Sequence, residues 1–209
     1  MQSINRSPFD FWHVAKPGGP LLASTEKKPV EIQVILHESI RLTQSQKDRM
    51  QKNFNLIQSE FKKYAGREVK FNVDHYSHLR GFSKGGDKLS DLNSQVDYLK
   101  RQQKQQATDN SEGLKKYLFI TPKSEDGHPG SGAPGLDAGI AALNDDRGIA
   151  HAVGLMFGAK PSDAEVNYHF PWWYETVMND SSVSTMHAND YRFSDKNRTN
   201  IRTYLNKFS

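Results

Sequence analysis

The apolar stretch 148–161 contains one side chain that could bind a metal ion, the imidazole of His151. Read as a helix, this stretch places His151 and Leu155 on one face, one turn apart, and ends at Gly158, where the chain can bend. A catalytic zinc site has three protein ligands and a water, so one imidazole is not expected to hold zinc or to lower the pKa of a bound water. Ala152 offers no carboxylate to accept a proton. The stretch predicts an apolar helix with one histidine that could bind a metal ion, and without the other groups of a catalytic zinc site.

The same stretch resembles the H-E-x-x-H-x-x-G-x-x-H segment of the metzincin (matrixin- and astacin-like) zinc metalloproteases. His151 and Gly158 match, whereas Ala152 replaces the base, Leu155 the second ligand and Pro161 the third. The resemblance implies a degenerate member with no catalytic residues, five relic positions (His151, Ala152, Leu155, Gly158 and Pro161) and no zinc or other cofactor. Natural loss explains three replacements more simply than engineering, which would change the base alone. Taken by itself, the stretch is better explained as an ordinary apolar helix with a buried, hydrogen-bonded histidine; the segments on either side favour the resemblance.

The residues before this stretch predict a strand, a helix and a second strand. Val30 to Leu36 alternates and is rich in β-branched residues, which favours a strand. A helix follows, with Thr43 or Ser45 as its N-cap and Gly66 at its end. The alternating Val69, Phe71 and Val73 then predict the second strand. This order implies a parallel pair with a right-handed crossover, as at the start of the metzincin catalytic domain.

Further segments are similar to the metzincin pattern. The run 134–143 is similar to the segment that leads into the edge strand above the active-site cleft. Two sites could provide the methionine-containing turn of the family, around Met178 and around Met186. Ser194 is a good N-cap for a last helix, whose buried stripe comprises Ile201, Tyr204 and Leu205. The sequence therefore predicts an α+β, zincin-like domain with a twisted mixed sheet, a central helix of the active-site type and a C-terminal helix.

The expected organisation is an irregular N-terminal arm, residues 1–29, followed by the metzincin-like domain, residues 30–209. The arm is rich in proline and glycine. Residues 74–113 are polar and form a possible insertion, in which Leu89, Leu92, Val96 and Leu99 could line a helix.

A contact surface is expected where the resemblance places a substrate cleft. The candidate residues are Leu136, Ala138, Ile140, His169, Trp172, Trp173 and Tyr174. Edge strands pair with extended peptides, and tryptophan and tyrosine are frequent anchors of interfaces. The alternatives are an ordinary apolar strand and core packing, although the adjacent Trp172 and Trp173 cannot easily both face inward.

Composition sets limits on the remaining functions. The chain has 209 residues, 35% hydrophobic residues and no cysteine, with a mean hydropathy of -0.77. The missing cysteines exclude disulfides and a thiol nucleophile. No stretch is long and apolar enough for a membrane span. The net charge of +4 is spread along the chain without a recognised motif, so nucleic-acid binding is not expected. The resemblance to the family implies a secreted or periplasmic location, although no signal peptide is visible in the sequence.

Three functions remain open. The first is an inactive metzincin-like protein that binds a protein or peptide partner in its cleft, as part of a secreted toxin or effector. The second is a metalloprotease with a relocated metal site that combines His151 with other histidines (His128, His169 and His187) and a carboxylate base, Glu165 or Glu175. The third is a basic module that binds an anionic polymer. The sequence defines neither the partner nor the oligomeric state.

Overall fold

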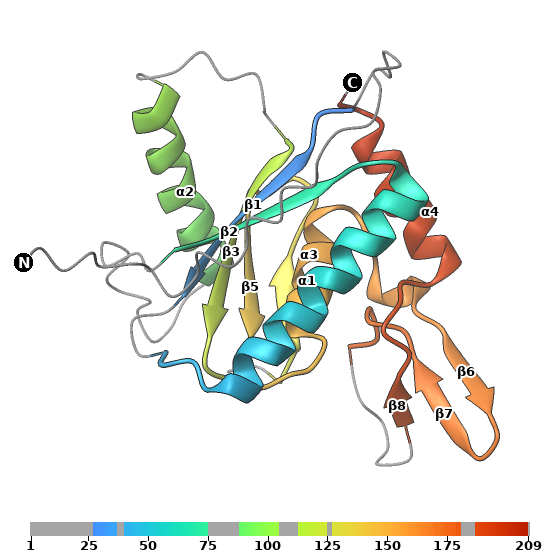
Figure 1. Cartoon of the computed structure of the whole chain (residues 1–209). Helices are drawn as coiled ribbons and strands as arrows, with labels where there is room; N and C mark the ends of the chain where they lie inside the picture. The colour runs from blue at the N-terminus through green and yellow to red at the C-terminus, as the bar shows by residue number, and fades with distance from the viewer. Residues whose placement is uncertain are drawn as a thin grey trace, which may run out of the picture.

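The computed structural model describes residues 27–36, 40–74, 88–104, 113–124, 127–180 and 187–208. Five of its strands form one sheet in the order β2-β1-β3-β5-β4 (Figure 1). Four of them run parallel: β1 (Val30–Leu36), β2 (Val69–Asp74), β3 (Lys115–Thr121) and β5 (Ala138–Ala142). The short β4 (Gly130–Gly132) runs antiparallel to β5 at the edge. The predicted mixed sheet, with its parallel opening pair, is confirmed.

Helix α1 (Gln44–Ala65) has the ends that the sequence predicts. Of the two candidate N-caps, Thr43 takes the position, and its side chain and that of Gln46 bond each other's backbone N–H in a capping box. Gly66 ends the helix with a left-handed backbone, φ 65°. Local sequence signals therefore determine both ends of this helix.

Helices cover both faces of the large sheet (Figure 1). Helices α1, α3 (Gly148–Met156) and α4 (Asp195–Leu205) share the larger core on one face. Helix α2 (Lys88–Lys104) packs Leu92 and Val96 against the other face, where they meet Tyr117 and Phe119 of β3. The helix expected within residues 74–113 is therefore present and contributes to a core. Of the predicted arm, residues 1–26 lie outside the described chain. No helix in the described ranges has the length and apolar character needed to cross a membrane.

The edge of the sheet differs from the prediction. The resemblance predicts that the run 134–143 leads into the edge strand, but its strand, β5, lies between β3 and β4. The edge is β4, a three-residue strand of sequence Gly-Ser-Gly. Because glycine and serine have little preference for strands, the sequence pattern did not indicate it.

A second, three-stranded sheet follows α3 and projects from the body (Figure 1). A short 3₁₀ helix, η2 (Pro161–Asp163), leads to β6 (Val166–His169), which forms an antiparallel hairpin with β7 (Trp172–Glu175). Strand β8 (His187–Asn189) runs parallel to β7.

The two ends of the described chain are joined by a buried arginine. Arg67 donates from Nη1 to the carbonyl oxygen of Lys28, at 2.7 Å, and from Nη2 to that of Leu205, at 2.9 Å. Lys27 also donates to the side chain of Asn206. The start of β1 and the end of α4 therefore lie side by side.

Candidate functional site

His151 lies fully buried on α3, between a backbone carbonyl and a carboxylate. Its Nδ1 lies 3.0 Å from the carbonyl oxygen of Val177. A carbonyl only accepts, so Nδ1 carries the proton and Nε2 presents its lone pair. Nε2 lies 3.2 Å from Oδ1 of Asp180 but makes no hydrogen bond of good geometry within the described structure. A backbone partner on one ring nitrogen is the arrangement that orients a metal-binding histidine.

Burial lowers the pKa of His151 below its ordinary value. The hydrogen bond to Val177 and the charge of Asp180 act in the opposite direction and do not reverse this effect. Arg147 lowers the pKa further, while Asp145 raises it. The imidazole is therefore neutral at neutral pH.

A tight turn with Met178 at its third position lies directly beneath α3. The N–H of Asn179 donates to the carbonyl of Thr176, at 3.1 Å, and Met178 is fully buried. A Cβ added at Gly154 of α3 would lie 2.5 Å from Sδ of Met178. Of the two methionines predicted for such a turn, Met178 occupies this position, while Met186 lies outside the described residues.

Ala152 is fully buried against the edge strand β4. A Cβ built on Gly130 would lie 2.9 Å from the Cβ of Ala152 and 2.8 Å from the carbonyl oxygen of Gly148. Strand and helix therefore approach each other as closely as the glycine and the alanine permit. The position that holds the base in the family pattern has no room for a longer side chain in this packing.

The other relic positions lie toward the end of α3. Leu155 is half-buried, and Gly158 follows the helix with a φ of 91°, as predicted for the bend. Pro161 begins η2 and supplies no metal-binding atom. The three positions that would carry ligands thus hold one imidazole, one isobutyl group and one pyrrolidine ring.

The histidines proposed for a relocated metal site have different partners. Nδ1 of His128 lies 3.8 Å from Oδ1 of Asp180, the same oxygen that lies 3.2 Å from Nε2 of His151. His187 contacts Glu175, and the ring of His169 packs against Tyr174 at 5.5 Å. In the part of the chain that is described, no group of three His, Cys, Asp or Glu residues could hold a metal ion. Among the positions that match the ligand pattern of the resembling family, only His151 has a side chain that could bind a metal ion.

A buried ion-pair network connects α3 to the second sheet. Arg147, at the N-terminus of α3, donates to Glu175 at 3.0 Å, and Glu175 also contacts His187. The side chains of Arg147 and Glu175 are only 9% and 3% exposed, so each depends on the other for compensation. The two residues are 28 positions apart, and nothing in the sequence pattern paired them. Glu165, the other proposed base, is paired with Arg192 at 2.9 Å.

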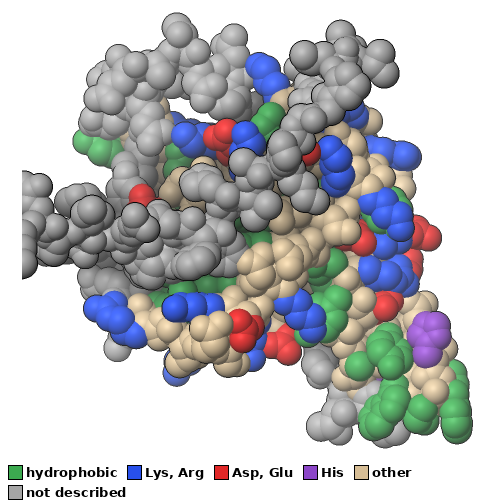
Figure 2. Space-filling view, in the orientation of Figure 1, with side chains coloured by type: hydrophobic (Ala, Val, Ile, Leu, Met, Phe, Trp, Pro, Cys, Tyr) green, Lys and Arg blue, Asp and Glu red, His purple; other side chains and the backbone are tan. Residues whose placement is uncertain are grey.

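The predicted contact residues do not form one surface. Ala138 and Ile140 pack with the core beneath α2, on the face of the sheet opposite α3, and Leu136 is half-buried. Their assignment to a common cleft with the hairpin is wrong, because alternate residues of β5 face opposite sides. The hairpin residues His169, Trp172 and Trp173 are exposed instead, and Tyr174 is half-buried. Figure 2 shows the apolar side chains gathered there beside a histidine.

The fold is similar to that of a metalloproteinase of known structure. Metalloproteinase-II from Bacteroides fragilis has a similar structure, with a TM-score of 0.55 and 16% sequence identity over 88% of this chain and 55% of that protein. A zinc-dependent peptidase from Methanocorpusculum labreanum gives a TM-score of 0.45 and 16% identity over 81% and 99% of the two chains. No protein-family model matches the chain, and no curated protein is significantly similar in sequence.

The chain spans just over half the length of the Bacteroides protein. At 16% identity the likeness establishes the fold alone. The predicted α+β, zincin-like architecture is thereby confirmed, and the activity is a separate question.

Proposed function

We propose that this protein is a catalytically inactive member of the metallopeptidase fold that acts by binding a protein or peptide partner. The observation that carries the proposal is the packing of Ala152 against β4. A general base must reach the proton it removes, and Ala152 has neither a carboxylate nor space for one. Leu155 and Pro161 in place of imidazoles point in the same direction.

The proposal assigns the turn at Met178 as the counterpart of the family's methionine turn. Its support is the contact of Met178 with Gly154 under α3 and the bond of the adjacent Val177 carbonyl to His151. A secreted or periplasmic location, within a toxin or effector, belongs to the same proposal and rests on the habit of the family alone.

The edge strand β4 offers a place for an extended partner. The carbonyl of Pro129 accepts a hydrogen bond from the N–H of Ala142, at 3.1 Å. Along an antiparallel pair, hydrogen-bonded and non-hydrogen-bonded residue pairs alternate, so the register fixes which residues of β4 bond to β5. The backbone groups of Ser131 therefore face β5, while those of Gly130 and Gly132 face outward. An extended peptide can add to such an edge through backbone hydrogen bonds, whether or not a bond is then cut.

Two measurements test the loss of chemistry. Metal analysis of the purified protein, with melting curves in added zinc and in chelator, should show no stoichiometric zinc and no effect of the chelator. A library of quenched fluorescent peptides should remain uncut. Bound zinc together with cleavage would contradict the proposal and favour a metalloprotease with a non-standard site, for which the closeness of Asp180 to His128 and His151 is the supporting observation.

Peptide binding has its own test. Peptides selected from a random library displayed on phage should bind the wild-type protein and Gly132→Ala but not Gly132→Pro. Both variants add a Cβ near Met156, at 3.1 Å, and only proline removes the outward N–H. Equal binding by the two variants would exclude pairing at β4.

A further inference from the structure

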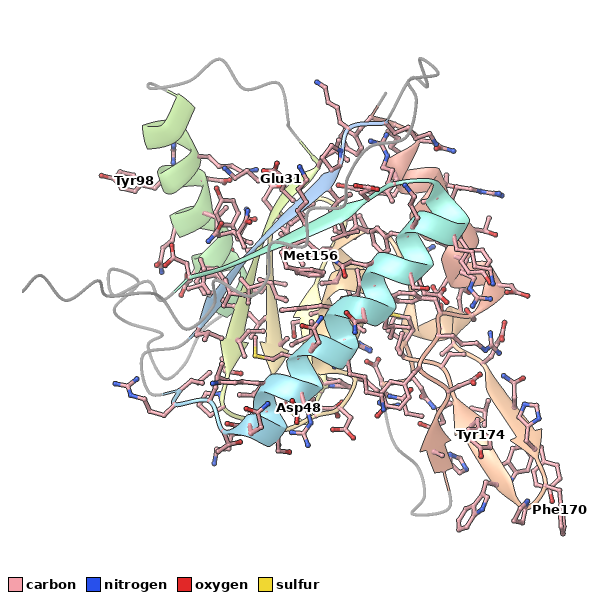
Figure 3. The ribbon with its side chains drawn as sticks, in the orientation of Figure 1. Glu31, Asp48, Tyr98, Met156, Phe170 and Tyr174 are labelled. Atoms are coloured by element: carbon pink, nitrogen blue, oxygen red, sulfur yellow. The ribbon has the colours of Figure 1, made fainter. Side chains whose placement is uncertain are left out.

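The hairpin formed by β6 and β7 carries five of the six large hydrophobic side chains that are exposed among the described residues; the sixth is Tyr98 of α2. The exposed fractions are 87% for Phe170, 51% for Tyr168, 47% for Trp172, 44% for Val166 and 41% for Trp173. Phe170 lies at the far end of the hairpin, pointing away from the body (Figure 3). Such a contiguous group marks an interaction site rather than ordinary surface.

Aromatic rings lie on both faces of this hairpin. Tyr168 is opposite Trp173, with ring centroids 4.8 Å apart, and the neighbouring pair of His169 and Trp172 faces the other way. A groove on a protein partner would cover one face and leave the other in water. A lipid interface surrounds an inserted hairpin on all sides, so it fits both faces together.

The tip is also free of formal charge. No Asp, Glu, Lys or Arg occurs between Glu165 and Glu175. These two flanking carboxylates are compensated at the base of the hairpin by Arg192 and Arg147 respectively. An uncharged tip enters a medium of low dielectric constant without a large desolvation cost, and it offers no cationic group for anionic lipids.

The hairpin is long enough to reach the depth of a membrane interface. Four residues in each strand span about 13 Å at about 3.3 Å per residue. Interfacial segments bury their apolar face about 5–10 Å into the boundary between headgroups and acyl chains. Phe170 would then lie deepest, and Tyr168, Trp172 and Trp173 would lie at the headgroup level, which these residue types favour.

We propose that the tip of the hairpin, residues 168–173, inserts into the interface of a zwitterionic phospholipid bilayer. This goes beyond the proposed function, because lipid binding would use the β6–β7 hairpin and peptide binding would use β4. The two surfaces belong to different sheets, so one binding activity can fail while the other persists.

Co-sedimentation with phosphatidylcholine vesicles tests the proposal. The wild-type protein should bind, and Phe170→Asp should weaken binding about tenfold or more, because a carboxylate is disfavoured in the interface. The matched control is Tyr98→Asp, on α2, where the native side chain is 59% exposed and the change should have no effect on binding. Circular dichroism and melting curves should show that both variants remain folded. Absence of wild-type binding, or equal binding by the two variants, would overturn the proposal.

Quenching by brominated lipid locates the contact. Of the three tryptophans, Trp172 and Trp173 lie in the hairpin, so Trp12→Phe leaves only these two as reporters. Vesicles of phosphatidylcholine brominated near the headgroup end of the acyl chains should quench their fluorescence. Vesicle binding without quenching would assign the contact to another surface. If the protein ignores vesicles but self-associates in a manner that Phe170→Asp abolishes, the hairpin is a protein interface and the proposal is wrong.

Discussion

The carboxylate of Asp180 lies 3.2 Å from Nε2 of His151, the ring nitrogen that the Val177 carbonyl leaves without a proton. In a zinc peptidase the corresponding nitrogen would face a cation. Here it faces a carboxylate and has no hydrogen bond of good geometry among the described residues. The orientation of the imidazole resembles that of a ligand, whereas its surroundings are those of a buried neutral side chain.

This burial predicts a pH dependence. The folded-state pKa of His151 is below the ordinary 6.5, so in the unfolded chain the residue binds its proton at a higher pH. Stability due to this residue should therefore fall as the pH drops below 6.5, and it should stop falling below the folded-state pKa. We expect His151→Gln to flatten that part of the profile, as measured by urea unfolding from about pH 8 to about pH 5. Parallel profiles for the two proteins would contradict the assignment.

Ala152→Glu should destabilise the fold strongly. The longer side chain meets β4 at Gly130, and its carboxylate would be buried without a partner. We expect a loss of about 3–5 kcal/mol in the free energy of unfolding. Leu155→Glu, which introduces the same group at a half-buried position of the same helix, should cost less. If Ala152→Glu and Leu155→Glu lower the free energy of unfolding equally, then β4 moves away from α3 and leaves room for a carboxylate at position 152.

Gly154→Ala should reverse the usual effect of this substitution. In an exposed helix, alanine is more favourable than glycine by about 1 kcal/mol. Here the new Cβ would lie 2.5 Å from Sδ of Met178 and 2.7 Å from Cε1 of Phe193, so we expect a loss of about 1–3 kcal/mol. Combined with Met178→Ala, the substitution should cost less than the sum of the single changes, because the shortened residue 178 makes room. Additive urea-unfolding energies would exclude this contact.

Arg147→Met should leave the buried carboxylate of Glu175 without its arginine partner. Removing one partner of a buried pair costs about 3–5 kcal/mol, and replacing both residues by methionine should recover part of that loss. The control is Lys62→Met, in the exposed pair with Glu68, where a change of less than about 1 kcal/mol is expected. Urea unfolding of the single and double variants measures all of these energies. A double variant that is less stable than Arg147→Met would contradict the prediction.

The sequence predicts those elements whose signals are local. The caps of α1 at Thr43 and Gly66, and the N-cap of α4 at Ser194, occur where the residue types indicate, because each bonds backbone within one helical turn. The edge strand could not be predicted in this way, because Gly-Ser-Gly carries no strand pattern.

The residues that surround His151 could not be predicted from the sequence either. Its partner at Nδ1 is a backbone oxygen, which no residue type specifies, and Asp180 is 29 positions away in the chain. One matching histidine, one matching glycine, a candidate methionine turn, the pattern of the last helix and the order of the elements predict the zincin-like fold. The packing that fills the space around Ala152 became visible only when β4 was placed.

Arg67 joins the backbone at Lys28 to that at Leu205, so both ends of the described chain meet at one pole of the molecule. The tip of the β6–β7 hairpin occupies the opposite pole (Figure 1). A protein coupled to a biosensor chip through its carboxyl end would therefore present this tip to the flowing solution.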